Sequence, residues 1–314
     1  MENIELVCNC DFNRWKDAVQ ITGTVENWIF SAEDYNLWNE GLGPENFNFL
    51  CAIDKTTGKT VGHIASAYYP SIDGSEPLAT AGAYFVCKEY RGTGVGMDLS
   101  VKIGQEERFA YCNQGTISVA SMTKKYALFG LTIYPEWQYE DMEAKVSDCN
   151  PDLLESNRNI KTVALNEVDS GKFIEYDTKI CGGIRRDNFI RKVLESKTAF
   201  SRIAIDKNEN IVGFGNIRIG FNNQLAIGPL YADSDSIAET LLKDCLKLIP
   251  NLNEFSLIYY YPSSTTLGAK DIFYKLASKN VKENDRMYVQ FSSHVPKIDS
   301  TKIYSITEYA LSFC

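Results

Sequence analysis

The sequence predicts a mixed α/β protein with two domains in tandem. The chain has 314 residues, of which 44% are hydrophobic and 23% charged, as is typical of a globular protein of about two domains. Segments rich in β-branched and aromatic residues alternate with segments of helical apolar spacing. The order hairpin, strand, helix, strand, short helix occurs once in each half. We therefore expect two twisted mixed sheets, each with helices on both faces.

In the first half, residues 49–54 and 60–69 are predicted to form a hairpin, because residues 55–59 (Lys-Thr-Thr-Gly-Lys) are a turn cluster. Residues 79–87 form the next predicted strand. A helix is expected over residues 97–111, whose apolar positions lie four apart on one face. The other elements expected in this half are strands at 4–8 and 116–120 and helices at 12–21, 32–40 and 124–130.

In the second half, residues 201–206 and 211–220 are predicted to form a hairpin, followed by a strand at 225–231. A helix is expected to begin near Ser236, where Ser236-x-x-Glu239 matches a capping box. The other elements expected in this half are helices at 187–196 and 272–278 and strands at 255–261, 286–291 and 302–307.

The polar, turn-rich stretch 147–159 predicts the division between the two halves. The expected domains are therefore residues 1–148 and residues 149–314.

Composition narrows the classes of function. The 32 Lys and Arg residues against 41 Asp and Glu leave a net charge of -9, which argues against general nucleic-acid binding. No apolar run approaches the ~20 residues that span a bilayer, and residues 1–5 lack the basic and apolar regions of a secretory signal. Nine cysteines without a Cys-x-x-Cys pair and only two histidines offer no structural zinc set. Reduced thiols and a cytoplasmic location are expected, with no metal.

The segment that carries chemistry is a glycine-rich turn between a predicted strand and a predicted helix. It reads Arg91-Gly92-Thr93-Gly94-Val95-Gly96. Glycines let the backbone turn tightly and approach a ligand closely, and the amides of a helix N-terminus attract an anion. The turn therefore predicts a phosphate or pyrophosphate site, to which Arg91 adds a positive charge.

Three nucleotide-binding patterns compete for this turn. A P-loop requires Lys-Ser or Lys-Thr after its last glycine, and none follows Gly96. A dinucleotide fingerprint requires Gly-x-Gly-x-x-Gly after the first strand, whereas this turn has Gly-x-Gly-x-Gly in mid-domain. The third pattern, Arg/Gln-x-x-Gly-x-Gly/Ala, fits at every fixed position.

On these residues the chain resembles the GNAT superfamily of acyl-CoA-dependent N-acetyltransferases. Residues 126–131 (Tyr-Ala-Leu-Phe-Gly-Leu) resemble the Tyr-x-x-x-Gly-Phe pattern of that family, with Leu in place of Phe. The resemblance covers about residues 1–147. It implies that Tyr126 acts as general acid toward the departing thiolate, and that acetyl-CoA is held by a strand that splays from its neighbour and by the turn. The implied acetyl-CoA-binding residues are Phe85, Val86, Arg91, Gly92, Thr93, Gly94, Val95 and Gly96.

The second half resembles the GNAT-like domain that follows an N-terminal GNAT domain in tandem proteins. The resemblance rests on Ile-Gly-Pro-Leu-Tyr-Ala-Asp at residues 227–233, with residues 176–177, 185–186, 286–288 and 303–307 as further matches. This half lacks the glycine turn, and Pro229 has no amide to donate. We expect it to bind no CoA, and either to shape the acceptor pocket or to pack against the first domain.

The expected function is N-acetyl transfer from acetyl-CoA to a primary amine by direct attack. The general base is open: residues 79–87 contain no carboxylate, and Tyr84 and His63 are the available groups. Alternatives are a non-catalytic acyl-CoA-binding or interaction module, which the missing carboxylate favours, and an acyltransferase for longer chains. The acceptor amine and the oligomeric state stay open, and no nucleic-acid or membrane partner is expected.

Overall fold

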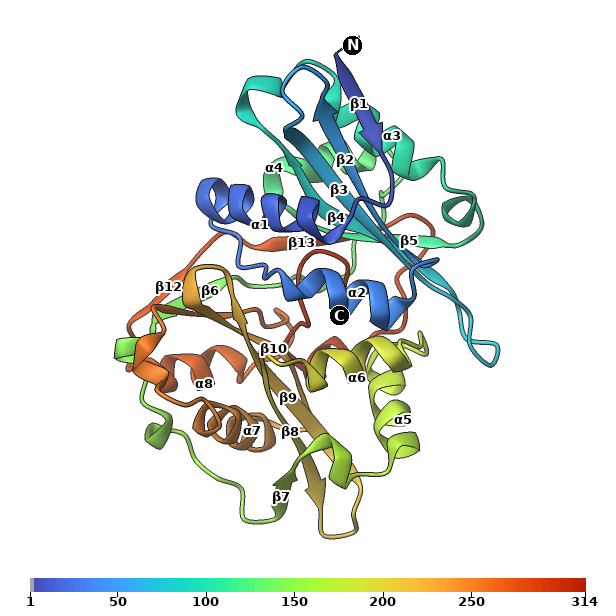
Figure 1. Cartoon of the computed structure of the whole chain (residues 1–314). Helices are drawn as coiled ribbons and strands as arrows, with labels where there is room; N and C mark the ends of the chain where they lie inside the picture. The colour runs from blue at the N-terminus through green and yellow to red at the C-terminus, as the bar shows by residue number, and fades with distance from the viewer. Residues whose placement is uncertain (1–2) are drawn as a thin grey trace.

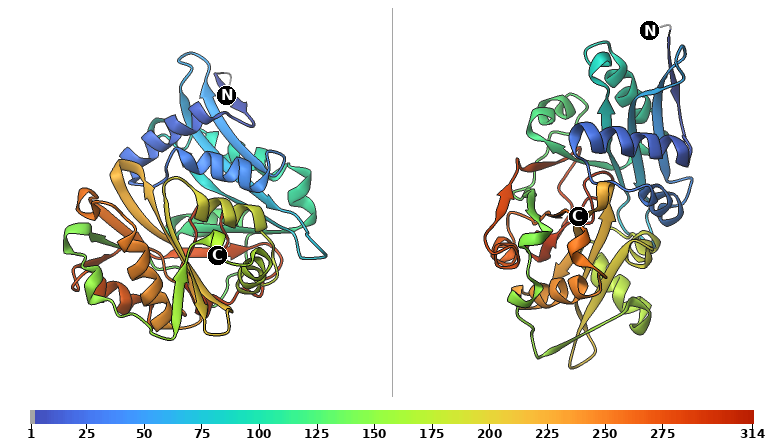
Figure 2. Two further views of the ribbon diagram at one scale, coloured as in Figure 1. Left: turned by 60° about the horizontal axis from the view of Figure 1, so that its bottom comes forward. Right: turned by 60° about the vertical axis from the view of Figure 1, so that its left-hand side comes forward.

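The computed structural model describes residues 3–314. Residues 1 and 2, part of the N-terminal stretch in which no secretory signal is expected, lie outside the described part. Two mixed sheets lie one above the other, with the C-terminus between them (Figures 1 and 2). Only β4–β5 and β10–β11 pair in parallel; the other pairs are antiparallel. The expected tandem of mixed sheets is confirmed.

The first sheet has the strand order β1-β2-β3-β4-β5-β13. Helices α1 and α2 cover one face and α3 covers the other. Consecutive strand residues point to opposite faces, so Phe49 packs with Trp15 and Trp38, whereas Leu50 packs with Leu99. The elements of this part are β1 (Ile4–Val7), α1 (Phe12–Glu26), α2 (Glu33–Leu42), β2 (Phe47–Asp54), β3 (Thr60–Tyr69), β4 (Leu78–Val86), α3 (Val95–Gly104), β5 (Asn113–Val119), α4 (Ala120–Ala127) and β13 (Met287–Phe291).

The second sheet has the order β12-β6-β11-β10-β9-β8-β7, with β14 paired to β10. Helices α7 and α8 pack on one side of this sheet and α5 and α6 on the other. Its elements are β6 (Met142–Lys145), β7 (Ile160–Val163), α5 (Ser170–Ile180), α6 (Asp187–Glu195), β8 (Ala199–Asp206), β9 (Ile211–Gly220), β10 (Gln224–Ala232), α7 (Asp235–Lys247), β11 (Leu257–Tyr260), α8 (Ala269–Leu276), β12 (Val281–Glu283) and β14 (Ile303–Ser305).

The two sheets exchange strands. Strand β6, which precedes residue 148, pairs with β11 and β12 in the second sheet. Strand β13 runs from the second half back to the first sheet and pairs with β5 along its whole length, from Met287↔Val119 to Phe291↔Gly115. The division at residues 148 and 149 stays a prediction, and the strand pairing crosses it in both directions.

A buried ion pair also joins the two parts. Arg218 of β9 lies 3.0 Å from Asp34 of α2, and both side chains are almost fully buried. Around it, one apolar cluster includes residues of α1, α2, α5 and α6. Because a lone buried charge is costly, this pair fixes how α2 sits on the second sheet.

Two local predictions are wrong. The helix expected over residues 97–111 begins earlier, at Val95, and ends at Gly104; a separate 3-10 turn covers Glu107–Tyr111. A glycine inside a helix costs about 0.5–1 kcal/mol relative to Ala, so Gly104 is a weak point at which the helix ends. The capping box at Ser236 is absent: α7 starts at Asp235 after Ser234, and Glu239 binds Lys275 instead. Both predicted hairpins are confirmed.

Candidate active site

The central strands of the first sheet part from each other. Strands β4 and β5 pair in parallel only from Leu78↔Asn113 to Thr80↔Gly115. Beyond that point the Thr116 hydroxyl donates to the Ala81 carbonyl at 2.8 Å, and the backbones separate. We call residues 81–86 of β4 and 116–119 of β5 the β4–β5 fork. The fork leaves backbone groups of β4 without ladder partners on this side.

The glycine turn stands at the end of the fork. Gly92 and Gly94 have φ values of 81° and 100°, which L side chains rarely adopt. Gly94 caps α3, and the first intrahelical bond runs from Asp98 N to the Gly94 carbonyl. Helix geometry leaves the amides of Val95, Gly96 and Met97 without an intrahelical partner. The turn thus presents amides and the positive end of a helix dipole to one place, as an anion requires.

Two predicted CoA-binding side chains are occupied by protein partners. Arg91 lies 2.7 Å from Glu26 of α1, and its Nε donates to the Val86 carbonyl at 2.8 Å. The Thr93 amide and hydroxyl both donate to the Tyr90 carbonyl, at 3.3 Å and 2.7 Å. Arg91 therefore braces the turn against β4, and Thr93 closes the turn before it.

Tyr84 connects the turn to α4. A side chain at residue 96 would overlap the Tyr84 hydroxyl, so Tyr84 would have to move to admit one. Lys125 of α4 donates to this hydroxyl at 2.8 Å, and the Tyr126 ring meets the Tyr84 ring edge-on with centroids 6.4 Å apart. The structure therefore brings Tyr126 and the glycine turn to the same end of the fork, through a tyrosine and a lysine to which the sequence assigned no such part.

The hydroxyl of Tyr126 keeps its proton at neutral pH. Burial raises the pKa of Tyr126 far above its usual range, and the neighbouring Tyr84 raises it further. A neutral phenol can donate a hydrogen bond or a proton to a negative group that forms beside it. The arrangement is therefore compatible with a general acid.

His63 lies on the opposite face of the sheet from Tyr84. Its ring stacks on Phe85 with centroids 5.7 Å apart, and consecutive residues Tyr84 and Phe85 of β4 point to opposite faces. His63 is 2% exposed, and burial lowers its pKa to about 4. The structure therefore separates His63 from Tyr126 by the thickness of the sheet.

Sequence reasoning missed the last segment of the chain. Residues 307–314 run beside β4: the Leu311 carbonyl accepts from the hydroxyls of Tyr69 and Thr80, at 2.9 Å and 2.6 Å, and Ala310 packs against Gly82. These contacts join residues more than 200 positions apart. No motif marks this segment, so only the folded chain shows that it borders the fork.

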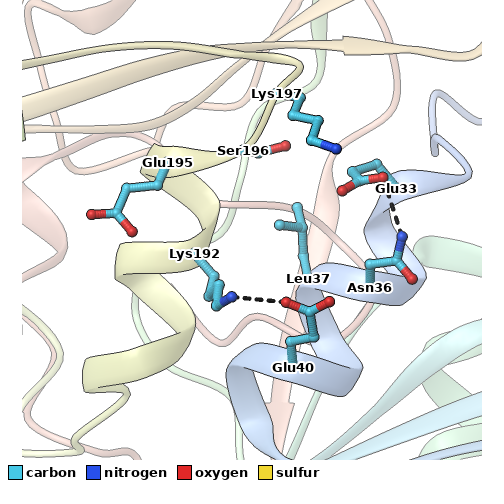
Figure 3. A pocket seen from close by; sticks show the side chains of 8 residues that line it. All are labelled: Glu33, Asn36, Leu37, Glu40, Lys192, Glu195, Ser196 and Lys197. Carbon is cyan, nitrogen blue, oxygen red and sulfur yellow. Dashed lines mark hydrogen bonds and ion pairs between the residues drawn. The ribbon is translucent and has the colours of Figure 1, made fainter.

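The cavity in Figure 3 lies elsewhere, between α2 and α6. Its volume is about 400 Å³, and Lys192 of α6 reaches Glu40 of α2 across it at 2.8 Å. Its lining is polar except for Leu37, and none of its residues belongs to the fork or the turn. Within residues 3–314, no group of three His, Cys, Asp or Glu side chains is placed to hold a metal ion. No helix in this range has the length and apolarity needed to cross a membrane.

Comparison with known proteins finds a family match in the second half of the chain, outside the fork and the glycine turn. Residues 173–305 match the family model described as an acetyltransferase (GNAT) domain. A Caenorhabditis elegans protein described as uncharacterized is 28% identical over 167 residues, which is 52% of this chain and 52% of that protein. The chain thus spans about half the length of this curated relative.

Solved structures share the whole architecture. A putative acetyltransferase from Pyrococcus horikoshii has a TM-score of 0.70 at 15% identity, covering 99% of this chain and 97% of its own. A tandem GNAT protein from the clavulanic acid biosynthesis pathway has a TM-score of 0.64 at 12% identity, with 92% and 98% covered. N-myristoyltransferase from Saccharomyces cerevisiae, with bound myristoyl-CoA, has a TM-score of 0.62 at 10% identity, with 98% and 90% covered.

The match to an acetyltransferase (GNAT) domain is confined to residues 173–305, whereas the likeness to solved acetyltransferase structures extends over the fold of the whole chain. The fold of the chain, two mixed sheets that follow one another and exchange strands, is similar to that of a tandem GNAT protein.

Proposed function

We propose that the chain transfers an acetyl group from acetyl-CoA to a primary amine, and that the reaction takes place at the first sheet. The observation that carries the proposal is the β4–β5 fork, which ends at the glycine turn and the start of α3. An extended pantetheine arm needs unpaired strand backbone along its length, and its pyrophosphate needs amides at one end. The fork offers the unpaired strand backbone, and the turn at its end offers the amides.

The residues of this region fit acetyl-CoA in distinct ways. The free amides at the start of α3, with Gly92 and Gly94 shaping the turn, would hold the pyrophosphate. Phe85 and Val86 would face the pantetheine through backbone groups of β4, although the Val86 carbonyl already accepts from Arg91. Arg91 and Thr93 would act by holding the turn in shape, since both are engaged within the protein.

The transfer needs no covalent enzyme intermediate. The neutral amine attacks the thioester carbonyl, and a β4 amide in the fork stabilises the negative oxygen that forms. The carbon–sulfur bond then breaks, and Tyr126 donates a proton or a hydrogen bond to the leaving thiolate. Holding both substrates in line supplies much of the rate. The nitrogen loses its proton to water once the carbon–nitrogen bond has formed.

The second sheet is proposed to bind no CoA. At the position that corresponds to the glycine turn, between β10 and α7, the chain has Asp233, Ser234 and Asp235. Two carboxylates at the start of a helix repel a phosphate that would otherwise be attracted there. We also propose a cytoplasmic place of action, because nine cysteines without a Cys-x-x-Cys pair are typical of reduced thiols.

One observation favours a second candidate, a non-catalytic acyl-CoA-binding module. Strand β4 (Leu78–Val86) contains no carboxylate, so the strand beside the acyl group offers no acidic side chain to take the proton of the amine. Both candidates require CoA to bind at the turn. Only the enzyme releases free thiol from acetyl-CoA when amines are added.

Thermal unfolding with and without acetyl-CoA tests the proposed site. Ligand at 100 times its Kd stabilises the folded state by about 2.7 kcal/mol, and we expect this shift in wild type but not in Gly94→Asp. The matched control is Gly74→Asp, because Gly74 has a positive φ (79°), as Gly94 does (100°), but lies in the β3–β4 loop. A shift that survives in Gly94→Asp rejects the turn as the site. Thiol release with a panel of amines then separates the enzyme from the binding module.

A further inference from the structure

The β4–β5 fork coincides with a bulge in strand β4. Between the pairs His63↔Phe85 and Ala65↔Gly82, β3 advances by two residues and β4 by three. Ala83 and Tyr84 therefore oppose the single residue Ile64. A bulge of this kind bends its strand and increases its twist. The bend follows directly after the last β4–β5 pair, which involves Thr80, so it carries β4 away from β5.

The bulge is held in an unfavourable backbone conformation. Ala83 has a φ of 47°, in the left-handed region that alanine seldom occupies. It is also buried, so water does not compensate the turned peptide groups. Such a conformation persists only where the surrounding structure over-determines it.

The side chain of His63 holds Ala83 in this backbone conformation. Its Nδ1 lies 2.7 Å from the Ala83 carbonyl oxygen. A carbonyl only accepts, so Nδ1 carries the proton and Nε2 holds the lone pair. The ring is fixed between Phe49 and Phe85, with centroid distances of 5.6 Å and 5.7 Å. The imidazole thus replaces the ladder bond that the bulge removes from the Ala83 carbonyl.

The other ring nitrogen has no such partner. Nε2 of His63 is buried and makes no hydrogen bond within residues 3–314 that the structure describes. A buried polar atom without a partner destabilises the fold, and an apolar side chain would avoid that loss. The unpaired Nε2 is therefore tolerated because Nδ1 makes a stabilising hydrogen bond to the bulge.

We propose that His63 is a positioning residue that holds the β4 bulge and thereby keeps the β4–β5 fork open for acyl-CoA. The inference rests on the proposed function for the identity of the ligand. It gives His63 a role different from the general base: its proton-bearing nitrogen is committed to Ala83, and it acts on the ligand only through β4.

Two amide substitutions separate this role from a general loss of packing. In His63→Asn the side-chain amide can take the place of Nδ1 and donate to the Ala83 carbonyl. In His63→Gln the amide falls near the place of Nε2, and the bond to Ala83 is lost. We expect His63→Asn to bind acetyl-CoA within about threefold of wild type, and His63→Gln to bind about tenfold more weakly, both measured by calorimetry at a temperature where circular dichroism shows folded protein.

The KM and kcat values extend the test. For His63→Gln we expect a higher KM for acetyl-CoA with kcat changed less than KM, because the residue shapes the binding site and does not touch the reacting atoms. A purely structural role would lower the melting temperature without this separation between Asn and Gln. Equal acetyl-CoA affinity in folded His63→Gln and wild type would overturn the proposal.

A measurement on unmutated protein keeps the proposal testable if the variants do not fold. The chain has only two histidines, so long-range ¹H–¹⁵N correlation spectra, assigned with His294→Gln, report the state of His63 directly. We expect the Nδ1–H form, with and without acetyl-CoA; an Nε2–H form would overturn the proposal. If wild type binds no acetyl-CoA, the proposed function fails, whereas binding that ignores the Asn–Gln difference defeats only the role of His63.

Discussion

The ammonium group of Lys125 donates a 2.8 Å hydrogen bond to the hydroxyl of Tyr84 and lies 4.9 Å from the centroid of its ring. Helix α4 is thereby joined to β4 across the β4–β5 fork. The same tyrosine hydroxyl packs on Gly96, in the first turn of α3. The contact through Tyr84 places the charge of Lys125 beside the proposed pyrophosphate site. Within the described residues Lys125 contacts no carboxylate that would neutralise this charge.

Removing this charge should weaken acetyl-CoA binding. We expect Lys125→Met to raise the Kd about fivefold, equivalent to ~1 kcal/mol for one partly screened charge, and to reduce the dependence of Kd on salt. Lys124→Met is the matched control, since Lys124 is on the same helix but exposed. Titration calorimetry at two salt concentrations measures both effects. Equal losses in the two variants would show that the net charge of α4 matters and the bridge does not.

Replacing the proposed general acid should slow turnover and spare binding. In Tyr126→Phe the ring and its contact with Tyr84 stay, while the proton donor is lost. We expect kcat to fall about 100-fold, the low end for general acid catalysis, with the Kd for acetyl-CoA within about twofold. Tyr111→Phe, at an 81% exposed position, should match wild type. Steady-state kinetics with a thiol-release assay checks this, and full activity in Tyr126→Phe would remove the residue from the mechanism.

Asp141 should make stability depend on pH. Burial raises its pKa to about 6 from an ordinary value of 3.8, although the hydrogen bond from Asn284 opposes the shift. The folded state therefore binds a proton more tightly than the unfolded state. Stability is highest below about pH 4 for this group and falls as pH rises toward 6, by on the order of 2–3 kcal/mol in total.

The variant Asp141→Asn should lack this step. Its amide oxygen can still accept from Asn284, so the variant should equal or exceed wild-type stability above pH 6. Urea unfolding at pH 4.5, 5.5 and 6.5 measures the slope, and Asp152→Asn, at an exposed position, is the control that should retain it. A wild-type slope that persists in Asp141→Asn would assign the titration to another group.

The strand exchange predicts that the two halves do not fold separately. A chain of residues 1–148 lacks β13, which pairs with β5 from Gly115 to Val119, and keeps β6, whose partners β11 and β12 are absent. An uncovered central strand exposes backbone groups that pair with other chains. We expect this fragment and residues 149–314 to aggregate or stay unfolded when expressed alone, by gel filtration and circular dichroism. Two monomeric folded fragments would contradict the exchange.

Much of the fold is readable from the sequence because its signals are local. The hairpins β2–β3 and β8–β9 follow from strand-forming runs around polar turns, and their observed bounds differ from the expected ones by a few residues. The helix after the glycine turn was expected too long, because apolar spacing continues past Gly104 while the backbone there does not stay helical. Periodicity predicts which face is buried more reliably than where an element ends.

The candidate site is readable in part. The glycines of the turn follow from a spacing that the chemistry of anion binding requires, and Tyr126 follows from a resemblance. The contacts that hold the region together do not follow from the sequence. Arg91 meets Glu26, Tyr84 meets Lys125 and His63 meets Ala83 only in the folded chain. A charge or a hydroxyl in the sequence does not state which of many possible partners will satisfy it.

The sequence by itself determined the mixed α/β class, the tandem arrangement and the glycine turn proposed to bind an anion, because each depends on residues close together in the chain. Tertiary structure alone decided that β13 completes the first sheet and β6 the second, and that Asp34 meets Arg218. Strands pair through backbone N–H and C=O groups, which nearly all residues share, so side chains do not specify the partner strand directly. The choice of partner depends on how all the elements pack together.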